Sequence, residues 1–382
     1  MVLIMTLPDL HTKGSEGVFM KSNGIRFVSF SLIFIIVLSL LSNIYNDGRN
    51  AGYTQFYNEP RNSFDVLIFG NSIHRDMWSP AVFWNETGIK AYNLSAHASP
   101  SNAQYYWLKE ALKYQSPSVV ILYGRWFFIE NDNDNEEAEY RLRIAMDSMR
   151  FSRNKIEAIT DIVSNSGKQH AIDYLFSVFR FHARKVLTPD DFVLSRDSQR
   201  NLSMRYPSRG KSEVNIEKHV LPTEFHNEDH NPKFTINSIY LQKAIDLCRE
   251  HGIEVILTVP PDNRIENWSI NMHRTLQEYA DSQGVTLLDF YYGEPCAAVN
   301  FSGETDFRDI NHLNIGGATK ASRYMAHYLS THFGLPDRRA ENHDAHWDDV
   351  LKAYNDLYQE YEDALNAESS AENDRYEGER EN

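Results

Sequence analysis

The chain has little of what a disulfide-stabilised or nucleic-acid-binding protein needs. Its 382 residues include only two cysteines, Cys248 and Cys296, which leave open a disulfide between them and do not report the redox compartment. The formal net charge is -15, which argues against nucleic acid as a partner, because phosphates are bound by Lys and Arg. Much of this charge is local, since 15 acids and 5 bases lie between Asp337 and Asn382.

Only one long apolar run is present. Residues 27–45, FVSFSLIFIIVLSLLSNIY, carry no charge, and about 20 such residues span the hydrocarbon core of a bilayer. Lys13, Lys21 and Arg26 precede the run, which favours a cytoplasmic tail at 1–26 and an extracytoplasmic remainder. A cleaved signal peptide is the alternative, but the run is long and no A-x-A site follows it. The sequence therefore predicts a single-pass protein of the cell membrane.

Strands and helices alternate after a polar stretch at 46–62, which we expect to be a linker. Apolar runs at 65–70, 89–95, 118–124, 253–261 and 285–290 predict strands, and helical patterns occur at 101–115, 233–252, 267–284 and 314–334. Strands with little alternation, separated by helices, indicate a parallel sheet covered on both faces. With right-handed crossovers, residues 63–335 are predicted to form an α/β fold with a three-layer, doubly wound parallel sheet.

Two further segments lie outside this alternation. Residues 130–233 are predicted to be a largely helical insertion over the carboxyl edge of the sheet, where substrate-selecting loops usually lie. The acidic segment 336–382 contains one helical stripe, formed by Trp347, Leu351, Tyr354, Tyr358, Tyr361 and Leu365. This stripe predicts a helix packed back on the domain, with a partner helix as the alternative. Residues 367–382 are predicted to be disordered.

The first predicted strand runs directly into Gly70, Asn71 and Ser72. Ligands of open parallel sheets bind at the carboxyl ends of the strands, and a serine becomes a nucleophile when a base and an orienting group accompany it. TDFRDINHLNIGG, residues 305–317, places Asp309 three residues before His312, between the last strand and the last helix of the sheet domain. Either motif alone is weak, but together they predict a catalytic triad of Ser72, His312 and Asp309 at one sheet edge.

These motifs, in this order, resemble those of the SGNH/GDSL hydrolase superfamily over residues 64–333. FGNS matches the first block, and the resemblance implies that Ser72 is the nucleophile and that its amide is an oxyanion donor. DINH matches the last block, which implies His312 as general base and Asp309 as its orienting acid. YNLSAHASPS, residues 92–101, aligns with the second block and implies a second oxyanion donor at the amide of Ala98, or of Ser95.

The third block of that superfamily, G-x-N-D, has no counterpart in this chain. The third predicted strand ends in LYGRWFF, where Arg125 follows Gly124 and no Asn is present. Loss of a side-chain oxyanion donor costs a hydrolase on the order of 10²-fold or more in rate. This departure argues against simple, fast ester hydrolysis.

With its single anchor and GNS in place of GDS, the chain resembles membrane-anchored members of the superfamily. These include the D-alanyl transfer protein of teichoic acid assembly and polysaccharide O-acetyltransferase-like proteins. The resemblance implies an acyltransferase or esterase that acts on cell-envelope polysaccharide or lipid-linked glycan through an acyl-serine, with an acyl carrier as the other substrate. It also implies a membrane-bound O-acyltransferase as partner and no cofactor or metal. The alternatives are a non-catalytic assembly or binding protein with a degenerate site and, third, an ordinary lipase.

Other polar residues are candidates for substrate binding. Arg125 suits a carboxylate or phosphate, although an ion pair at the sheet edge is an equal alternative. His74 and Asn71 flank Ser72, and His97 lies in the second block; either histidine has a structural, hydrogen-bonded role as its alternative. HNEDH, residues 226–230, is interpreted as a solvated loop, because no further ligand pattern supports zinc.

Overall fold

The computed structural model describes residues 12–44, 51–129, 136–163, 171–181, 236–262, 268–340 and 345–380. Its centre is one five-stranded sheet in the order β2-β1-β3-β4-β5, and every pairing is parallel. The strands are β1 (Val66–Phe69), β2 (Ala91–Asn93), β3 (Val119–Tyr123), β4 (Glu254–Val259) and β5 (Thr286–Asp289). β1 and β3 are buried along their whole length, which explains their uninterrupted apolar sequences.

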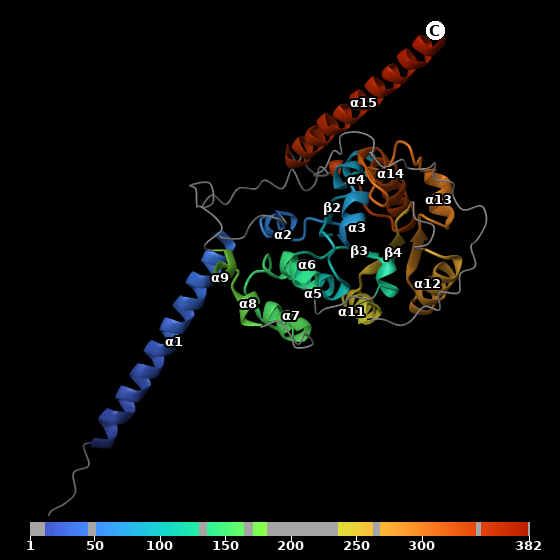
Figure 1. The fold of residues 1–382 in the computed structure, drawn as a ribbon. Coiled ribbons are helices and arrows are strands. Elements are labelled where there is room, and N and C mark those ends of the chain that lie inside the picture. The colour runs from blue at the N-terminus through green and yellow to red at the C-terminus, as the bar shows by residue number, and fades with distance from the viewer. Residues whose placement is uncertain are drawn as a thin grey trace, which may run out of the picture.

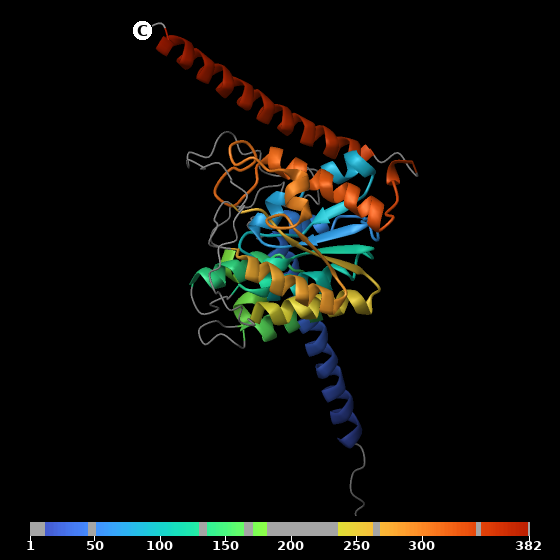
Figure 2. The same cartoon turned by 90° about the vertical axis from the view of Figure 1, so that its right-hand side faces the viewer.

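Helices cover both faces of the sheet, and Figures 1 and 2 show the sheet between the two helical layers. One layer contains α3 (Ser72–Met77), α4 (Pro80–Thr87), α13 (Glu294–Val299) and α14 (Ile315–His332). The other contains α5 (Ser101–Ala111), α11 (Ile236–Glu250) and α12 (Ile270–Gln283), and the short 3-10 helix η1 (Gly124–Phe127) follows β3. The predicted three-layer, doubly wound α/β fold is confirmed. The chain moves from β2 across β1 to β3, so the strand order reverses beside the end of β1.

The segment expected to be a polar linker is partly folded. α2 (Ala51–Phe56) packs into the main core, where Tyr53 and Phe56 are each 1% exposed. The Tyr53 ring stacks on Trp107 of α5 with 4.0 Å between the ring centroids. The linker interpretation is therefore wrong for residues 51–62, because aromatic side chains in a polar segment gain more by burial than by solvation.

The described part of the insertion is helical, as predicted. It contains α6 (Glu136–Met146), α7 (Arg153–Val163), α8 (Ile172–Leu175) and α9 (Val178–Phe181). α6 and α7 pack on the outer side of α5, where Trp107 Nε1 donates to the Ala145 carbonyl at 2.9 Å. The described part of the insertion therefore extends the helical layer that contains α5. The HNEDH motif lies outside the described residues.

The N-terminal helix α1 (Thr12–Ile44) contains the predicted apolar span. Its stretch Asn23–Ser42 has a mean hydropathy of 2.4 and is long and apolar enough to cross a membrane. The helix begins at Thr12, so residues 12–26 of the expected cytoplasmic tail are helical.

The C-terminal helix α15 (Ala345–Arg380) follows the 3-10 turn η4 (Arg338–Ala340) and packs on α4 and α14. Trp347, Val350 and Tyr354 are buried there, and Tyr361 donates to the Thr305 carbonyl at 2.8 Å. The predicted packing of the stripe on the domain is thus seen. The helix then continues to Arg380 and extends away from the domain (Figures 1 and 2), where a disordered tail was expected.

Candidate active site

Ser72 is the first residue of α3, three residues after the end of β1. Asn71 caps this helix, since its side-chain oxygen accepts from the amides of Ile73 at 3.1 Å and His74 at 3.4 Å. Gly70 is required at the turn, because a Cβ there would lie 2.3 Å from the Cβ of His74. The sequence Gly-Asn-Ser therefore turns the chain sharply and places Ser72, which is 8% exposed, at the carboxyl edge of the sheet.

Asp309 and His312 lie on a loop before α14, and backbone hydrogen bonds join the two sides of this loop. Arg308 N donates to the His312 carbonyl at 3.0 Å, and Asn314 N donates to the Asp306 carbonyl at 2.9 Å. Asn314 also caps α14 through the amide of Gly317 at 3.1 Å. These contacts hold the turn between the two catalytic candidates in one conformation.

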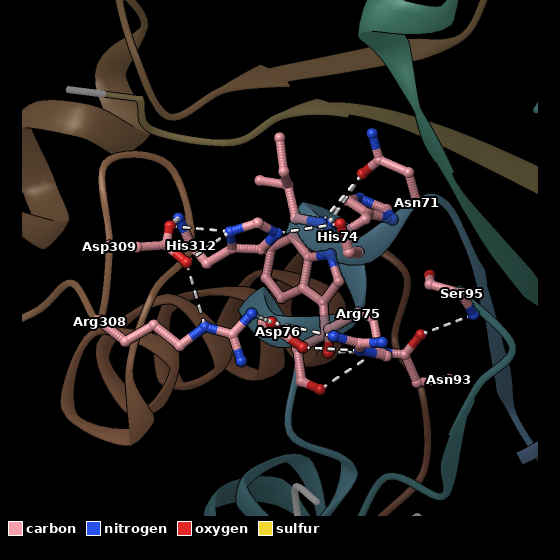
Figure 3. Close-up of polar contacts among 12 residues, drawn as sticks. Asn71, His74, Arg75, Asp76, Asn93, Ser95, Arg308, Asp309 and His312 are labelled. Carbon is pink, nitrogen blue, oxygen red and sulfur yellow. Dashed lines mark hydrogen bonds and ion pairs between the residues drawn. The ribbon is translucent and has the colours of Figure 1, made fainter. Parts of the chain in front are cut away.

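The three predicted triad residues form a continuous hydrogen-bonded chain, and Figure 3 shows the His312 ring beside the Asp309 carboxylate. His312 Nε2 lies 2.9 Å from the Ser72 hydroxyl oxygen, and His312 Nδ1 lies 2.8 Å and 3.0 Å from the two carboxylate oxygens of Asp309. Ser72 and His312 are 240 positions apart in the chain. Ser72 follows the carboxyl end of β1, and the His312 loop reaches the same edge of the sheet after β5 and the short helix α13. This is the geometry of a nucleophile, a base and an orienting carboxylate.

The surroundings of Asp309 keep its carboxyl group ionised. Burial alone would raise its pKa, but a hydrogen bond from the His312 ring, the amides of Asn311 and His312, and attraction to the imidazolium charge together lower the pKa well below the usual Asp value. The same carboxylate oxygen, Oδ1, accepts both amides, at 3.1 Å from Asn311 and 2.9 Å from His312. Asp309 can therefore act as a fixed anion that orients His312 and stabilises its protonated form.

A second polar layer surrounds Asp309, and sequence reasoning missed it. Arg308 lies between two carboxylates, with Nη2 2.7 Å from Asp76 Oδ2 and Nε 3.4 Å from Asp309 Oδ2. Asp76 is 4% exposed and also binds Arg75 at 2.7 Å (Figure 3). The signal in the sequence was the position of Arg308 directly before Asp309 in the motif. The partner Asp76 on α3 could not be read from the sequence.

The loop after β2 passes beside the turn that carries Ser72. Leu94 N donates to the Ile68 carbonyl at 2.8 Å, and Ala96 N donates to the Gly70 carbonyl at 3.1 Å. Ala98 follows two residues later with φ +48°, a left-handed conformation that few non-glycine residues adopt. The amide of Ser95 donates to the side chain of Asn93 at 3.0 Å, which makes the amide of Ala98 the better candidate for the second oxyanion donor.

Two of the proposed substrate contacts lie in the protein interior. His74 is fully buried, its Nε2 is 2.5 Å from the Thr258 hydroxyl of β4, and burial lowers its pKa to about 3. Arg125 is 9% exposed and pairs with Asp262 at 2.9 Å. In the structure, His74 forms a buried hydrogen bond and Arg125 forms an ion pair at the sheet edge. These are the structural roles that were the alternatives to substrate binding. Asn71 is partly exposed and adjoins Ser72.

His97 is exposed and lies close enough to His312 for the two rings to interact electrostatically. Its pKa is lowered by partial burial and by the positive charges of Arg75, His312 and Arg141, against the opposing charge of Asp76. Its ring contacts Tyr140 of α6 edge to face, with 6.4 Å between the centroids. The insertion therefore borders the site through α6.

Within the described ranges, no group of three or more His, Cys, Asp or Glu residues is arranged to hold a metal ion.

Comparison with known proteins gives similarity to solved structures alone. No protein-family model and no curated protein matches the chain. A protein assigned to the lipolytic G-D-S-L family from Desulfitobacterium hafniense is 12% identical with a TM-score of 0.35, over 69% of this chain and 98% of that one. A GDSL-like lipase from Bacteroides thetaiotaomicron is 11% identical with a TM-score of 0.33, over 76% of this chain and 100% of that one. Similarity at this level is loose, so the function is inferred below from the geometry of the site.

Proposed function

We propose that this protein is a serine-dependent acyltransferase or esterase that forms an acyl-serine intermediate on Ser72. The observation that supports this is the chain of contacts from the Ser72 hydroxyl to His312 Nε2 and from His312 Nδ1 to Asp309. A serine hydroxyl is a poor nucleophile unless a base within hydrogen-bond reach removes its proton. The site supplies that base, and the ionised Asp309 holds it in the required tautomer.

The first half-reaction transfers an acyl group to the enzyme. The Ser72 oxygen attacks the carbonyl carbon of an ester or thioester while His312 Nε2 takes the hydroxyl proton. The amides of Ser72 and Ala98 donate to the oxygen of the tetrahedral intermediate, and the Ser72 amide is free of an intrahelical partner because it begins α3. When the intermediate collapses, His312 returns the proton to the departing alcohol or thiol, and an ester remains on Ser72.

The second half-reaction moves the acyl group from Ser72 to an acceptor hydroxyl, which His312 deprotonates. We assign the acceptor to the sugar hydroxyls of cell-envelope polysaccharide or lipid-linked glycan, with a membrane-bound O-acyltransferase as the partner that handles the acyl carrier. The helix α1 supports this assignment, because a chain held at a membrane works at the surface where such polymers are assembled. Water as acceptor makes the same site an esterase.

A second candidate function is a non-catalytic assembly or binding protein of an envelope biosynthesis complex. The observation that favours it is the segment after β3, Gly124–Phe127, which contains no Asn and in which Arg125 forms a buried ion pair with Asp262. An oxyanion site built from two backbone amides is weaker than one with three donors.

A fluorophosphonate probe tests the proposed function directly, because it reacts with an activated serine. The wild-type protein is expected to be labelled on Ser72, and Ser72→Ala is expected to lose the label completely. Ser79→Ala is the matched control: Ser79 is also buried and lies just after α3, but its amide binds Ser322 and it does not contact His312. This variant should be labelled like wild type.

The same pair of variants separates the two candidates in the cell. If Ser72 carries the acyl group, Ser72→Ala lowers the ester content of the envelope polymer, whereas Ser79→Ala does not. A folded wild-type protein that takes no label, together with full ester content in the Ser72→Ala strain, would rule out the enzyme and leave the assembly protein.

A further inference from the structure

The C-terminal end of α1 is packed against the folded domain and is not a free tether. Leu38, Phe176 and Val178 form a small apolar core of their own, which is separate from the main core. Ile35 and Leu41 of α1 pack at its edge. Since positions 35, 38 and 42 recur at helical spacing, one face of α1 makes this contact and the other faces remain exposed.

Hydrogen bonds join the same two segments. Ser42 is 7% exposed, and its carbonyl accepts from the Ser177 hydroxyl at 3.0 Å while its hydroxyl accepts from the amide of Val178 at 3.4 Å. The α8–α9 segment, residues 171–181, is therefore held beside the last two turns of α1, as Figure 1 shows.

This contact determines the depth of the α8–α9 segment relative to a bilayer. The apolar stretch of α1 ends at Ser42, and Leu38 and Ile35 lie about 6 Å and about 10 Å before that end at 1.5 Å per residue. Side chains that pack against Leu38 and Ile35 are thus level with the outermost 5–10 Å of the hydrocarbon region, which is the depth of interfacial helices.

The α8–α9 segment carries apolar side chains beyond those it needs for packing on α1. Phe176 stacks on Phe151 with 5.2 Å between the centroids and contacts Phe179 edge to face at 6.2 Å. Phe179 is nevertheless 54% exposed, and Ile36, Val37 and Leu40 of the neighbouring helix α1 are exposed as well.

We propose that the α8–α9 segment is a second membrane contact, which places Phe179 among the lipids of the leaflet that α1 leaves at Ser42. The bilayer is the occupant of this face because the face continues the lipid-facing surface of α1 at the same height. Two contacts, one spanning and one interfacial, fix the orientation of the domain on the membrane. The active-site edge is then held at a set height above the surface. This inference rests on α1 spanning the bilayer and is independent of the chemistry at Ser72.

Site-directed spin labelling of the full chain in phosphatidylcholine nanodiscs tests the proposal. A nitroxide is attached at Phe179→Cys, at Ile33→Cys in the middle of the apolar stretch, and at Ala298→Cys on α13, which lies far from α1 in Figures 1 and 2. Cys248 and Cys296 are free but buried, so the unsubstituted protein is the labelling blank. The measurement is the ratio of collision rates with oxygen, which concentrates in lipid, and with a water-soluble nickel chelate.

The ratio at position 179 is expected to be several-fold higher than at position 298 and to approach that at position 33. A ratio at 179 equal to that at 298 would overturn the proposal, and so would a label at 179 shielded from both reagents, which would indicate a protein partner on this face. If Phe179→Cys does not fold, Phe179→Trp replaces it. Brominated phosphatidylcholine must then quench this variant more than wild type, and equal quenching would likewise overturn the proposal.

Discussion

Two of the polar clusters in the described part of this domain differ in their construction. At the carboxyl edge of the sheet, Ser72, His312 and Asp309 form a linear chain of hydrogen bonds, and the His312 and Asp309 side chains are 16% and 39% exposed. Between α5, α6 and α7, the buried charges of Glu110, Arg143, Asp147 and Lys155 face one another with 7% exposure or less. The first cluster reaches the surface through Asp309, whereas the second is buried.

Both clusters contain a group with a strongly shifted pKa, but the causes are opposite. Hydrogen bonds to the charged form lower the pKa of Asp309 against the effect of burial. Burial itself lowers the pKa of Lys155 to about 8, against the attraction of Asp147 and Glu110. A shifted pKa alone therefore does not identify an active site. The contact between a nucleophile and a base at a sheet edge is the stronger indicator.

Among substitutions that keep the nucleophile, the largest expected effect is at Asp309. Asp309→Asn should lower the rate of acyl transfer from an activated ester by roughly 10²- to 10⁴-fold, because the imidazole loses the anion that orients it. The pKa of Asp309 is lower in the folded than in the unfolded protein, so wild type is stabilised above the usual Asp pKa of about 4 and loses this as the pH falls. The variant should lack that contribution in acid unfolding curves. An unchanged rate in Asp309→Asn would show that Asp309 does not act with His312 and Ser72 as a catalytic triad.

Lys155→Met should change stability and leave the rate of acyl transfer alone. The unfolded lysine keeps its proton up to about pH 10.5 and the folded one loses it near 8, so wild-type stability rises with pH in that window. One pKa unit corresponds to about 1.4 kcal/mol, so burial of the charge costs on the order of 3 kcal/mol at neutral pH. Urea unfolding should show a gain of about 1–3 kcal/mol at pH 7 and a flat profile from pH 8 to 10.5.

Lys109→Met is the control for that measurement, because Lys109 forms a half-exposed ion pair with Glu157. Such pairs contribute about 0–1 kcal/mol, so this variant should keep the wild-type pH profile. A Lys155→Met protein that follows the wild-type profile would show that Lys155 does not titrate in the interior.

Arg308→Gln should reduce kcat by about tenfold with little change in KM, because a carboxylate released from its second partner holds the imidazole less accurately. Arg308→Lys should have a higher kcat than Arg308→Gln, because lysine keeps a positive charge beside Asp309. Arg323→Gln is the matched control, since Arg323 pairs with Glu86 on the surface and its side chain is 55% exposed. Steady-state kinetics on an activated ester measure all three. A loss confined to KM would make Arg308 a substrate contact.

The smallest effect is expected for Ala98→Gly. An L-residue in the left-handed region lowers the free energy of unfolding by roughly 1–2 kcal/mol. Glycine avoids this strain but lowers the free energy of unfolding by about 0.5–1 kcal/mol, because it loses more conformational entropy on folding. The variant should therefore gain up to about 1 kcal/mol in urea unfolding, with fluorophosphonate labelling unchanged because the amide remains. Ala96→Gly should instead destabilise, since Ala96 is buried and has a negative φ. A destabilised Ala98→Gly protein would contradict the strain at this turn.

Much of the site could be predicted because its parts are local or follow from strand direction. Asp309 and His312 are three residues apart, so their contact is made within one turn. Ser72 follows β1 directly, the Asp309 loop comes after β5 and α13, and all carboxyl ends of a parallel sheet lie on one edge. Composition and periodicity were also sufficient for the apolar helix and for the alternation of strands and helices.

The residues whose surroundings the sequence does not predict are those whose partners lie on distant segments of the chain. The sequence suggests Arg125 as a substrate ligand, but its partner Asp262 is 137 positions away, beyond the next strand. His74 is close to Ser72 in the sequence, but the pitch of α3 turns it inward to Thr258. The polar composition around Tyr53 predicts a linker, and the ring of Trp107 on which Tyr53 stacks belongs to another helix.

The sequence by itself determined the period of each element, the side chains at each strand end and the local turn that joins Asp309 to His312, because these depend on residues within a few positions of one another. Only the tertiary structure decided that Arg308 binds Asp76, that Lys155 is buried, and that the end of α1 rests on the α8–α9 segment. Those contacts join segments far apart in the chain, and they form where packing of the whole domain brings the segments together.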